Sequence, residues 1–192
     1  MIDLKPPIRR ATAADAAALA EFINFAGEGL PLHVWRQIAG DGEDPWEIGR
    51  KRQVERMEVS TAFVIDEGGG AVACLTGYPI PAVPGPVADD ELDIFRPLIE
   101  LENLAPSTWY VNILAAYPEH RGRGFGVRLL ALAEDLAGEQ GLSAMSLIVA
   151  SANAGARRLY ERTGYGETAR RPIVKDGWDC ASDEWVLLVK PL

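Results

Sequence analysis

A short glycine-rich segment carries the clearest chemistry in this sequence. Residues 121–126 read RGRGFG and lie between an apolar run at residues 109–116 and a segment from Val127 onward whose apolar residues recur at helical spacing. A glycine turn between a strand and a helix leaves several backbone N–H groups without partners around one point, and the helix dipole adds partial positive charge there. The segment therefore predicts an anion site, most simply one for phosphate.

Two common phosphate loops do not fit the segment. A dinucleotide fingerprint needs a third glycine where Val127 stands, and an acidic residue after the next strand, where residues 151–153 read SAN. A nucleotide-triphosphate loop needs Gly-Lys-Ser/Thr, which is absent. The pattern that remains is Arg-x-x-Gly-x-Gly, formed by Arg121, Gly124 and Gly126.

This pattern resembles the acyl-coenzyme A (acyl-CoA) signature of the GCN5-related N-acetyltransferase (GNAT) superfamily, Gln/Arg-x-x-Gly-x-Gly/Ala between a strand and a helix. Residues 114–120 (LAAYPEH) are similar to the family's Leu-Ala-Val-x-Pro-x-x. Asn153, Ala156, Leu159-Tyr160 and Gly164-Tyr165 resemble its Asn-x-x-Ala-x-x-Leu-Tyr-x-x-x-Gly-Phe/Tyr. Strong matches cover residues 109–165, and the flanks agree only in the order of their elements.

The resemblance implies a fold and a co-substrate. The fold is a single α/β domain over residues 1–192, with one twisted mixed sheet of about seven strands, flanked by helices and splayed open between its fourth and fifth strands. The co-substrate is acetyl-CoA, and no metal is implied. Backbone amides of residues 122–127 would hold the pyrophosphate, and the main chain of Ala115 and Ala116 would pair with the pantetheine arm. The residues assigned to the cofactor are Leu114, Ala115, Ala116, Arg121, Gly122, Arg123, Gly124, Phe125, Gly126, Val127, Asn153 and Tyr160.

The resemblance also gives Tyr160 a catalytic role, as the general acid that protonates the departing thiolate. Asn153, Ala156 and Tyr160 stand at i, i+3 and i+7, so they share one face of a helix. That face could instead be entirely core. An unshifted tyrosine pKa would suffice for the acid role.

Deprotonation of the acceptor amine is harder to assign. A lysine-like amine is neutral only about once in a few thousand molecules at pH 7, so a base or a desolvating pocket must help. Several family members use an acid on the central strand, where this sequence offers Tyr110 and Asn112. We interpret Asn112 as a catalytic residue that binds substrate or a relay water, the alternative being a bond to a neighbouring backbone. Candidates for a water-relayed base are Glu28, Glu100 and Glu102.

The elements that must position these residues follow from hydrophobic periodicity and turn residues. We expect strands at residues 8–10, 61–66, 71–78, 109–116, 144–150, 165–174 and 184–189. We expect helices at residues 16–26, 32–39, 46–58, from 89 or 90 to 102, from 127 until Gly138 and Gly141 end it, and 153–162. A capping box at Thr12 and Asp15 begins the first helix.

Three further features keep two interpretations each. Residues 79–105 hold six acids and one arginine, so they form either an acidic lid that attracts an amine or an ordinary solvated helix face. The basic residues 50–52 and Arg56 form a solvated face or meet the nucleotide end of the cofactor. His33, among apolar neighbours, is more often structural than a base.

Bulk properties exclude other classes of function. The net charge of −9 argues against nucleic acid as a partner. No apolar run reaches the length of a membrane span, and the N-terminus lacks a signal peptide's apolar region. Cys74 and Cys180 have no metal-ligand spacing, so a cytoplasmic setting is expected. If the protein assembles, a homodimer is the most frequent outcome.

Together these observations predict an acetyl-CoA-dependent N-acetyltransferase. It would transfer an acetyl group to a primary amine of a small molecule or peptide by direct attack in a ternary complex. Two alternatives remain open: a non-catalytic acyl-CoA sensor that lacks a productive acceptor site, and a transferase for a longer acyl group.

Overall fold

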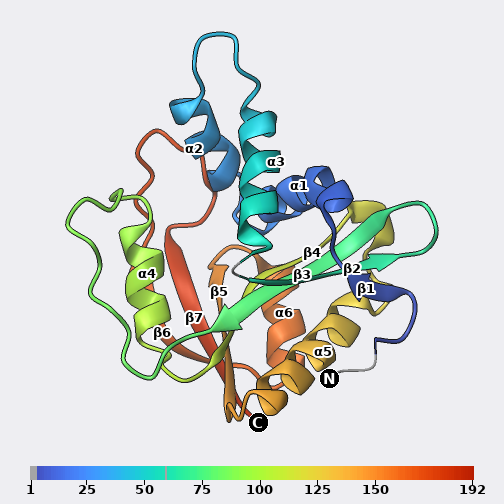
Figure 1. The fold of residues 1–192 in the computed structure, drawn as a ribbon. Helices are drawn as coiled ribbons and strands as arrows, with labels where there is room; N and C mark the ends of the chain where they lie inside the picture. The colour runs from blue at the N-terminus through green and yellow to red at the C-terminus, as the bar shows by residue number, and fades with distance from the viewer. Residues whose placement is uncertain (1–3, 59) are drawn as a thin grey trace. The chain divides into compact units, whose positions relative to one another are not determined.

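The computed structural model describes residues 4–58 and 60–192 (Figure 1). Its strands hydrogen-bond in the order β1-β2-β3-β4-β5-β7-β6, with both parallel and antiparallel pairs. Six α-helices accompany the seven strands within the described residues, so the predicted mixed α/β class is confirmed. The chain forms two compact units, one from its start to Gly77 plus Ile113–Leu130, the other from Tyr78–Asn112 and Ala131–Leu192. The single-domain expectation stays a prediction.

The first unit is built on an antiparallel sheet. β1 (Ile8–Arg10) is its edge strand and pairs with β2 (Thr61–Asp66), which pairs in turn with β3 (Ala71–Pro79). The turn between β2 and β3 forms because one carboxylate oxygen of Asp66 accepts the backbone N–H groups of Gly68 (2.8 Å) and Gly70 (3.0 Å). The predicted hairpin around residues 67–70 is therefore confirmed.

α1 (Ala16–Ala26) packs its apolar face on this sheet. The predicted capping box is present: the Asp15 carboxylate accepts the Thr12 N–H at 2.8 Å. Arg9 donates to both oxygens of Asp15 at 2.8 Å and also reaches Asp66, so β1, β2 and the start of α1 are joined by charged hydrogen bonds. The core beneath the helix contains Leu19, Phe22, Val64, Cys74 and Ile113.

Two further helices of the first unit, α2 (Leu30–Ile38) and α3 (Pro45–Arg56), pack closely against each other. The buried Gly49 of α3 lies against the Trp35 ring of α2, where a Cβ atom would clash with the ring. Asp44 caps α3 by accepting the Trp46 N–H at 3.0 Å. His33 lies 3.1 Å from the side chain of Gln37 one turn later, which agrees with the structural interpretation of that histidine.

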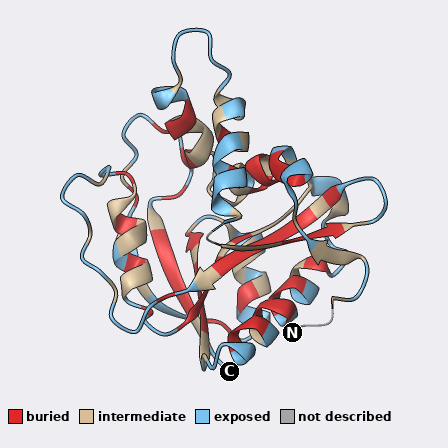
Figure 2. Ribbon diagram, viewed as in Figure 1, coloured by how far each residue is buried: buried red, intermediate tan, exposed pale blue. Residues whose placement is uncertain are grey.

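The second unit has β5 (Ala144–Ala150) as its central strand. β5 pairs in parallel with Trp109–Val111 of β4 (Trp109–Ala116), and its other edge pairs antiparallel with β7 (Glu184–Pro191). β6 (Gly166–Pro172) is the edge strand beside β7. Most residues of β5 and β7 are buried (Figure 2). α6 (Ala154–Arg162) ends at Gly164, which has the predicted left-handed backbone (φ 95°).

One predicted boundary, the start of the helix before residue 102, is wrong by several residues, and the other predicted bounds lie within two residues of the observed ones. α4 (Arg96–Asn103) begins at Arg96 and not at residue 89 or 90, because Pro97 has no N–H to donate and fits only the first turn of a helix. The preceding loop is held by Arg96, which donates to the side chain of Asp93 and to the carbonyl of Asp89. α5 (Phe125–Glu139) runs through Gly138 and is followed by Gly141, whose backbone is left-handed (φ 69°).

Neither a membrane span nor a metal cluster is found in the part of the chain that the structure describes. Its helices are too short or too polar to cross a bilayer. Its His, Cys, Asp and Glu side chains form no group of three or more that could hold a metal ion.

Candidate active site

The glycine-rich segment forms the predicted turn in the first unit. β4 ends at Ala116, a short 3₁₀ turn (Pro118–His120) follows, and α5 begins at Phe125. Gly122 (φ 74°) and Gly124 (φ 80°) both have left-handed backbones, which side chains with a Cβ adopt at a cost. An added Cβ at either glycine would meet nothing within 4 Å, so the space beside the turn is open.

The backbone amides of this turn are available to a ligand. The first bond of the helix is donated by the Arg128 N–H to the Gly124 carbonyl, at 3.1 Å. Among the described residues, the amides of residues 122–127 donate no hydrogen bond. The positive end of the α5 dipole lies at the same point. These donors therefore meet the geometric requirement for the predicted anion site.

The two arginines of the turn differ in their surroundings. Arg121 donates from Nε to the Ala116 carbonyl at 3.2 Å. Arg123 forms two hydrogen bonds to the carboxylate of Glu67, at 2.6 and 2.7 Å, and its guanidinium lies over the Phe125 ring. Glu67 therefore already neutralises part of the positive charge of Arg123, a residue that we predicted to bind the phosphate. We did not expect Glu67 here, since its place in a glycine-rich hairpin turn gives no sign of this contact.

The alternation of β4 distinguishes among its predicted pantetheine-binding residues. The Tyr117 N–H donates to the Val72 carbonyl of β3 at 3.1 Å, and the Ala115 amide is close enough to Cys74 to affect that thiol's pKa. Both amides therefore point toward β3. Because successive residues of a strand direct their backbone groups to opposite edges, the main chain of Leu114 and Ala116 points away from β3. This geometry favours Leu114 and Ala116 over Ala115 for main-chain pairing with a ligand.

The second unit contains the other two residues matched to the acyl-CoA pattern. Asn153 is the N-cap of α6, and its side-chain oxygen accepts the Ala156 N–H at 3.1 Å. Tyr160 lies two turns later, is buried, and has its ring centroid 5.8 Å from that of Tyr165. Burial raises the pKa of the Tyr160 phenol above its ordinary value. Its hydroxyl has no hydrogen-bond partner among the described residues.

The central strand presents Tyr110 and Asn112 in the second unit. Asn112 is partly exposed, and within the described residues its side chain forms no hydrogen bond to a neighbouring backbone. The Tyr110 ring is buried, and its centroid lies 5.3 Å from that of Tyr78 at the end of β3. The Tyr78 hydroxyl donates to Glu102 of α4 at 2.9 Å. The sequence analysis did not identify Tyr78, because its contact with Glu102 joins residues 24 positions apart and produces no local sequence pattern.

The three candidates for a water-relayed base have different surroundings in the structure. Glu100 is bonded to Arg171 of β6 at 2.7 Å, which makes it part of a surface ion pair. Glu28 belongs to the first unit and has a left-handed backbone (φ 53°). Glu102 is partly buried and lies in the same unit as Asn112 and Tyr160.

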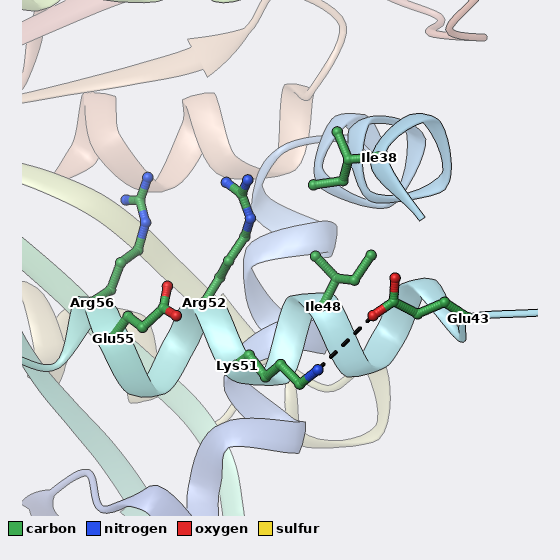
Figure 3. A pocket seen from close by; sticks show the side chains of 7 residues that line it. All are labelled: Ile38, Glu43, Ile48, Lys51, Arg52, Glu55 and Arg56. Atoms are coloured by element: carbon green, nitrogen blue, oxygen red, sulfur yellow. Dashed lines mark ion pairs between the residues drawn. The ribbon is translucent and has the colours of Figure 1, made fainter. Parts of the chain in front are cut away.

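A surface hollow of about 530 Å³ lies between α2 and α3 in the first unit (Figure 3). Ile38 and Ile48 face each other across it, and the side chains of Arg52 and Arg56 extend from the same side of α3. Lys51 pairs with Glu43, so it forms part of the predicted solvated face. Arg52 and Arg56 line the hollow and have no ion pair among the described residues.

Comparisons with known proteins agree on one family. The profile of the Acetyltransferase (GNAT) family matches residues 32–165. A Bacillus subtilis (strain 168) protein, "Uncharacterized N-acetyltransferase YhfO", is 30% identical over 161 residues, which cover 83% of this chain and 89% of that protein.

Two solved structures are similar in fold. The ribosomal-protein-alanine N-acetyltransferase from Brucella melitensis has a TM-score of 0.61 and 21% identity, and the match covers 96% of this chain and 99% of that one. The putative acetyltransferase yncA from Salmonella typhimurium, solved with acetyl-CoA, has a TM-score of 0.59 and 24% identity, covering 96% of this chain and 92% of that one.

Proposed function

This chain belongs to the GNAT family of N-acetyltransferases, and we propose that it moves an acetyl group from acetyl-CoA to a primary amine by direct attack in a ternary complex. One observation carries the proposal. The amides of residues 122–127 have no acceptor among the described residues, and they surround the start of α5. Amides so placed bind the diphosphate of acyl-CoA by charge-assisted hydrogen bonds.

The remaining cofactor contacts follow from the family match and the strand geometry. Leu114 and Ala116 supply main-chain groups to the pantetheine arm, as an added strand would receive them. Arg121 supplies charge near the diphosphate. The side chain of Asn153, which already caps α6, is assigned to the pantetheine by the same match.

Tyr160 is the proposed proton donor to the coenzyme thiolate. Burial raises the pKa of its phenol, which keeps the hydroxyl protonated throughout the physiological range. A thiol has an ordinary pKa near ~8.5, so complete transfer from the phenol is uphill, and Tyr160 acts chiefly by donating a hydrogen bond as the C–S bond breaks.

A covalent acyl-enzyme is not part of the proposal. Both cysteines are buried, and burial raises the pKa of the Cys74 thiol, which disfavours the thiolate that an acyl transfer would require. The acetyl group therefore passes directly from sulfur to nitrogen.

The test is a steady-state assay with purified protein. Acetyl-CoA is mixed with a panel of amines (polyamines, aminoglycosides, amino-acid amides and short peptides), and the release of free thiol is followed. Both substrates are then varied for the best amine. Intersecting double-reciprocal lines support a ternary complex, whereas parallel lines indicate a covalent intermediate. Tight binding of acetyl-CoA without thiol release from any amine would favour a sensor instead.

A further inference from the structure

Three titratable side chains of the first unit meet beside the glycine-rich turn. Arg123 donates from Nη1 and Nη2 to the two carboxylate oxygens of Glu67, at 2.6 and 2.7 Å. Its Nη1 also lies 3.0 Å from Nδ1 of His120, which ends the 3₁₀ turn between β4 and α5. The same His120 nitrogen is 3.7 Å from a Glu67 oxygen. Each of the three residues therefore contacts the other two, and we call them the Arg123 cluster.

Arg123 links this cluster to the predicted anion site. It belongs to residues 122–127, whose amides donate no hydrogen bond within the described residues. Its guanidinium lies 4.9 Å from the ring centroid of Phe125, the first residue of α5. A guanidinium is a fork of donors that fits phosphate oxygens as well as carboxylate oxygens. Glu67 therefore competes with a diphosphate for the same donors of Arg123.

The ion pair between Arg123 and Glu67 can be exchanged for a ligand. The two side chains are 46% and 35% exposed, and ion pairs this open to water contribute little net free energy. A diphosphate that also binds the amides of the turn can displace the carboxylate. The displaced Glu67 would then lie without its cation beside two added negative charges, which opposes binding.

His120 can remove this opposition by taking up a proton. A guanidinium has no acceptor, so the contact at 3.0 Å requires a His120 ring whose Nδ1 carries no proton and accepts from Arg123. A protonated ring cannot accept this bond and repels the guanidinium. It donates instead to Glu67, which is already within 3.7 Å. Histidine is the side chain that ordinarily changes charge between pH 5 and 8.

The charged neighbours of the cluster have other surroundings. Asp66, next to Glu67, accepts from Arg9 of β1 at 2.8 Å. Arg121 donates to the carbonyl of Ala116, and Glu119 is exposed. In the part of the chain that the structure describes, Glu67 and Arg123 are the charged side chains in contact with His120.

We propose that Glu67 and His120 are positioning residues for CoA binding that act through Arg123. Glu67 holds Arg123 until the diphosphate binds, and a protonated His120 then pairs with Glu67 while Arg123 bonds to the phosphates. The inference rests on the proposed function and adds a dependence on pH at the same site. Because the protonated form binds more tightly, affinity rises as the pH falls, and by reciprocity binding takes up protons.

The probe that tests this coupling is dephospho-CoA. It keeps the diphosphate but lacks the 3′-phosphate, a monoester that itself changes charge near pH ~6. Titration calorimetry at about pH 8 and about pH 5.5 spans the range in which histidine changes charge. We expect the wild type to bind about 5-fold or more tightly at the lower pH, since coupling between two sites is typically about 5- to 150-fold. Repeating the titration in two buffers of different ionisation enthalpy should show net proton uptake.

Three variants assign the effect to the cluster. His120→Gln keeps an acceptor for Arg123 but cannot be protonated, so both the pH dependence and the proton uptake should disappear. Glu67→Gln should bind more tightly than the wild type at about pH 8 and change little with pH, because no carboxylate competes for Arg123. His33→Gln removes the other histidine of the chain and should keep the wild-type pH dependence. A thermal melt of each variant checks that it is folded.

The outcomes separate this inference from the proposed function. Binding of dephospho-CoA that is equal at both pH values in the wild type, or an unchanged pH dependence in His120→Gln, would overturn the role of the cluster and leave the acetyltransferase proposal intact. No binding to the wild type at either pH would overturn both, because residues 122–127 would then hold no diphosphate.

Discussion

Replacing Gly124 by Ala tests the phosphate turn in a way that separates binding from stability. Gly124 has φ 80°, and a Cβ placed on it meets no atom of the protein within 4 Å. The change is therefore not blocked by packing. An L-residue with a Cβ pays about 1–2 kcal/mol in this backbone region. For a chain of this length that corresponds to a fall of roughly 2–8 °C in Tm.

Gly42 is a matched control, since its backbone is nearly the same (φ 79°) and the space around it is equally open. It lies in the loop between α2 and α3 and carries no predicted ligand contact. Gly42→Ala should lower Tm by a similar amount. Only Gly124→Ala should also weaken CoA binding. Its methyl group occupies the open side of the turn, and relaxation of the strained backbone turns one amide away from the ligand.

The size of the binding effect follows from the bonds at stake. A hydrogen bond between an amide and a charged phosphate contributes about 1.5–3 kcal/mol, so the loss of one raises the dissociation constant about 10- to 150-fold. Titration calorimetry with CoA measures this directly for both variants. Equal CoA affinity in Gly124→Ala and Gly42→Ala would refute the assignment of the turn to the diphosphate.

Three other predictions use the same protein. Tyr160→Phe should lower kcat by about 100-fold with little change in the acetyl-CoA dissociation constant, and unchanged kcat in the thiol-release assay would mean another acid. Glu67→Gln should tighten CoA binding by roughly 3- to 10-fold in calorimetry, because it frees the charge of Arg123, whereas weaker binding would show that the contact supports the turn. The Arg9 guanidinium lowers the pKa of Asp15 in the folded protein. The pair therefore stabilises the fold at pH values above the ordinary carboxyl pKa of about 3.9. This stabilisation is lost as the pH falls through the lower pKa of the folded state. Asp15→Asn should therefore lower Tm at pH 7, with the gap from wild type closing below about pH 4, and a gap that persists at pH 2 would contradict the linkage.

The sequence predicted the elements that have strong local signals. β4 and β5 have the predicted bounds because their apolar runs are bordered by turn residues or polar residues. The turn at residues 121–126 was predicted because glycines and arginines at that spacing, between an apolar run and a helical pattern, indicate a phosphate-binding turn. The predicted start of α4 was wrong because it followed the helical spacing of the apolar residues after residue 89. Pro97 has no N–H to donate and fits only the first turn of a helix, so α4 begins at Arg96.

The candidate site was predicted less completely, for a physical reason. Contacts between distant segments depend on how strands and helices pack. The local sequence around a residue does not show which distant residue it will contact. Glu67 with Arg123 and Tyr78 with Glu102 are such pairs, separated by 56 and 24 residues. The raised pKa of Tyr160 likewise comes from burial that only the folded chain creates. The roles assigned to the site residues stay predictions.

The central claim is that the amides of residues 122–127 bind the diphosphate of CoA. Amide chemical shifts in a ¹⁵N-labelled sample test it most directly, with CoA added in one titration and pantetheine, which has no diphosphate, in another. We predict that CoA shifts the amides of residues 122–127 strongly and that pantetheine leaves them nearly unchanged. Amides that do not respond to CoA, or that respond equally to pantetheine, would contradict the account.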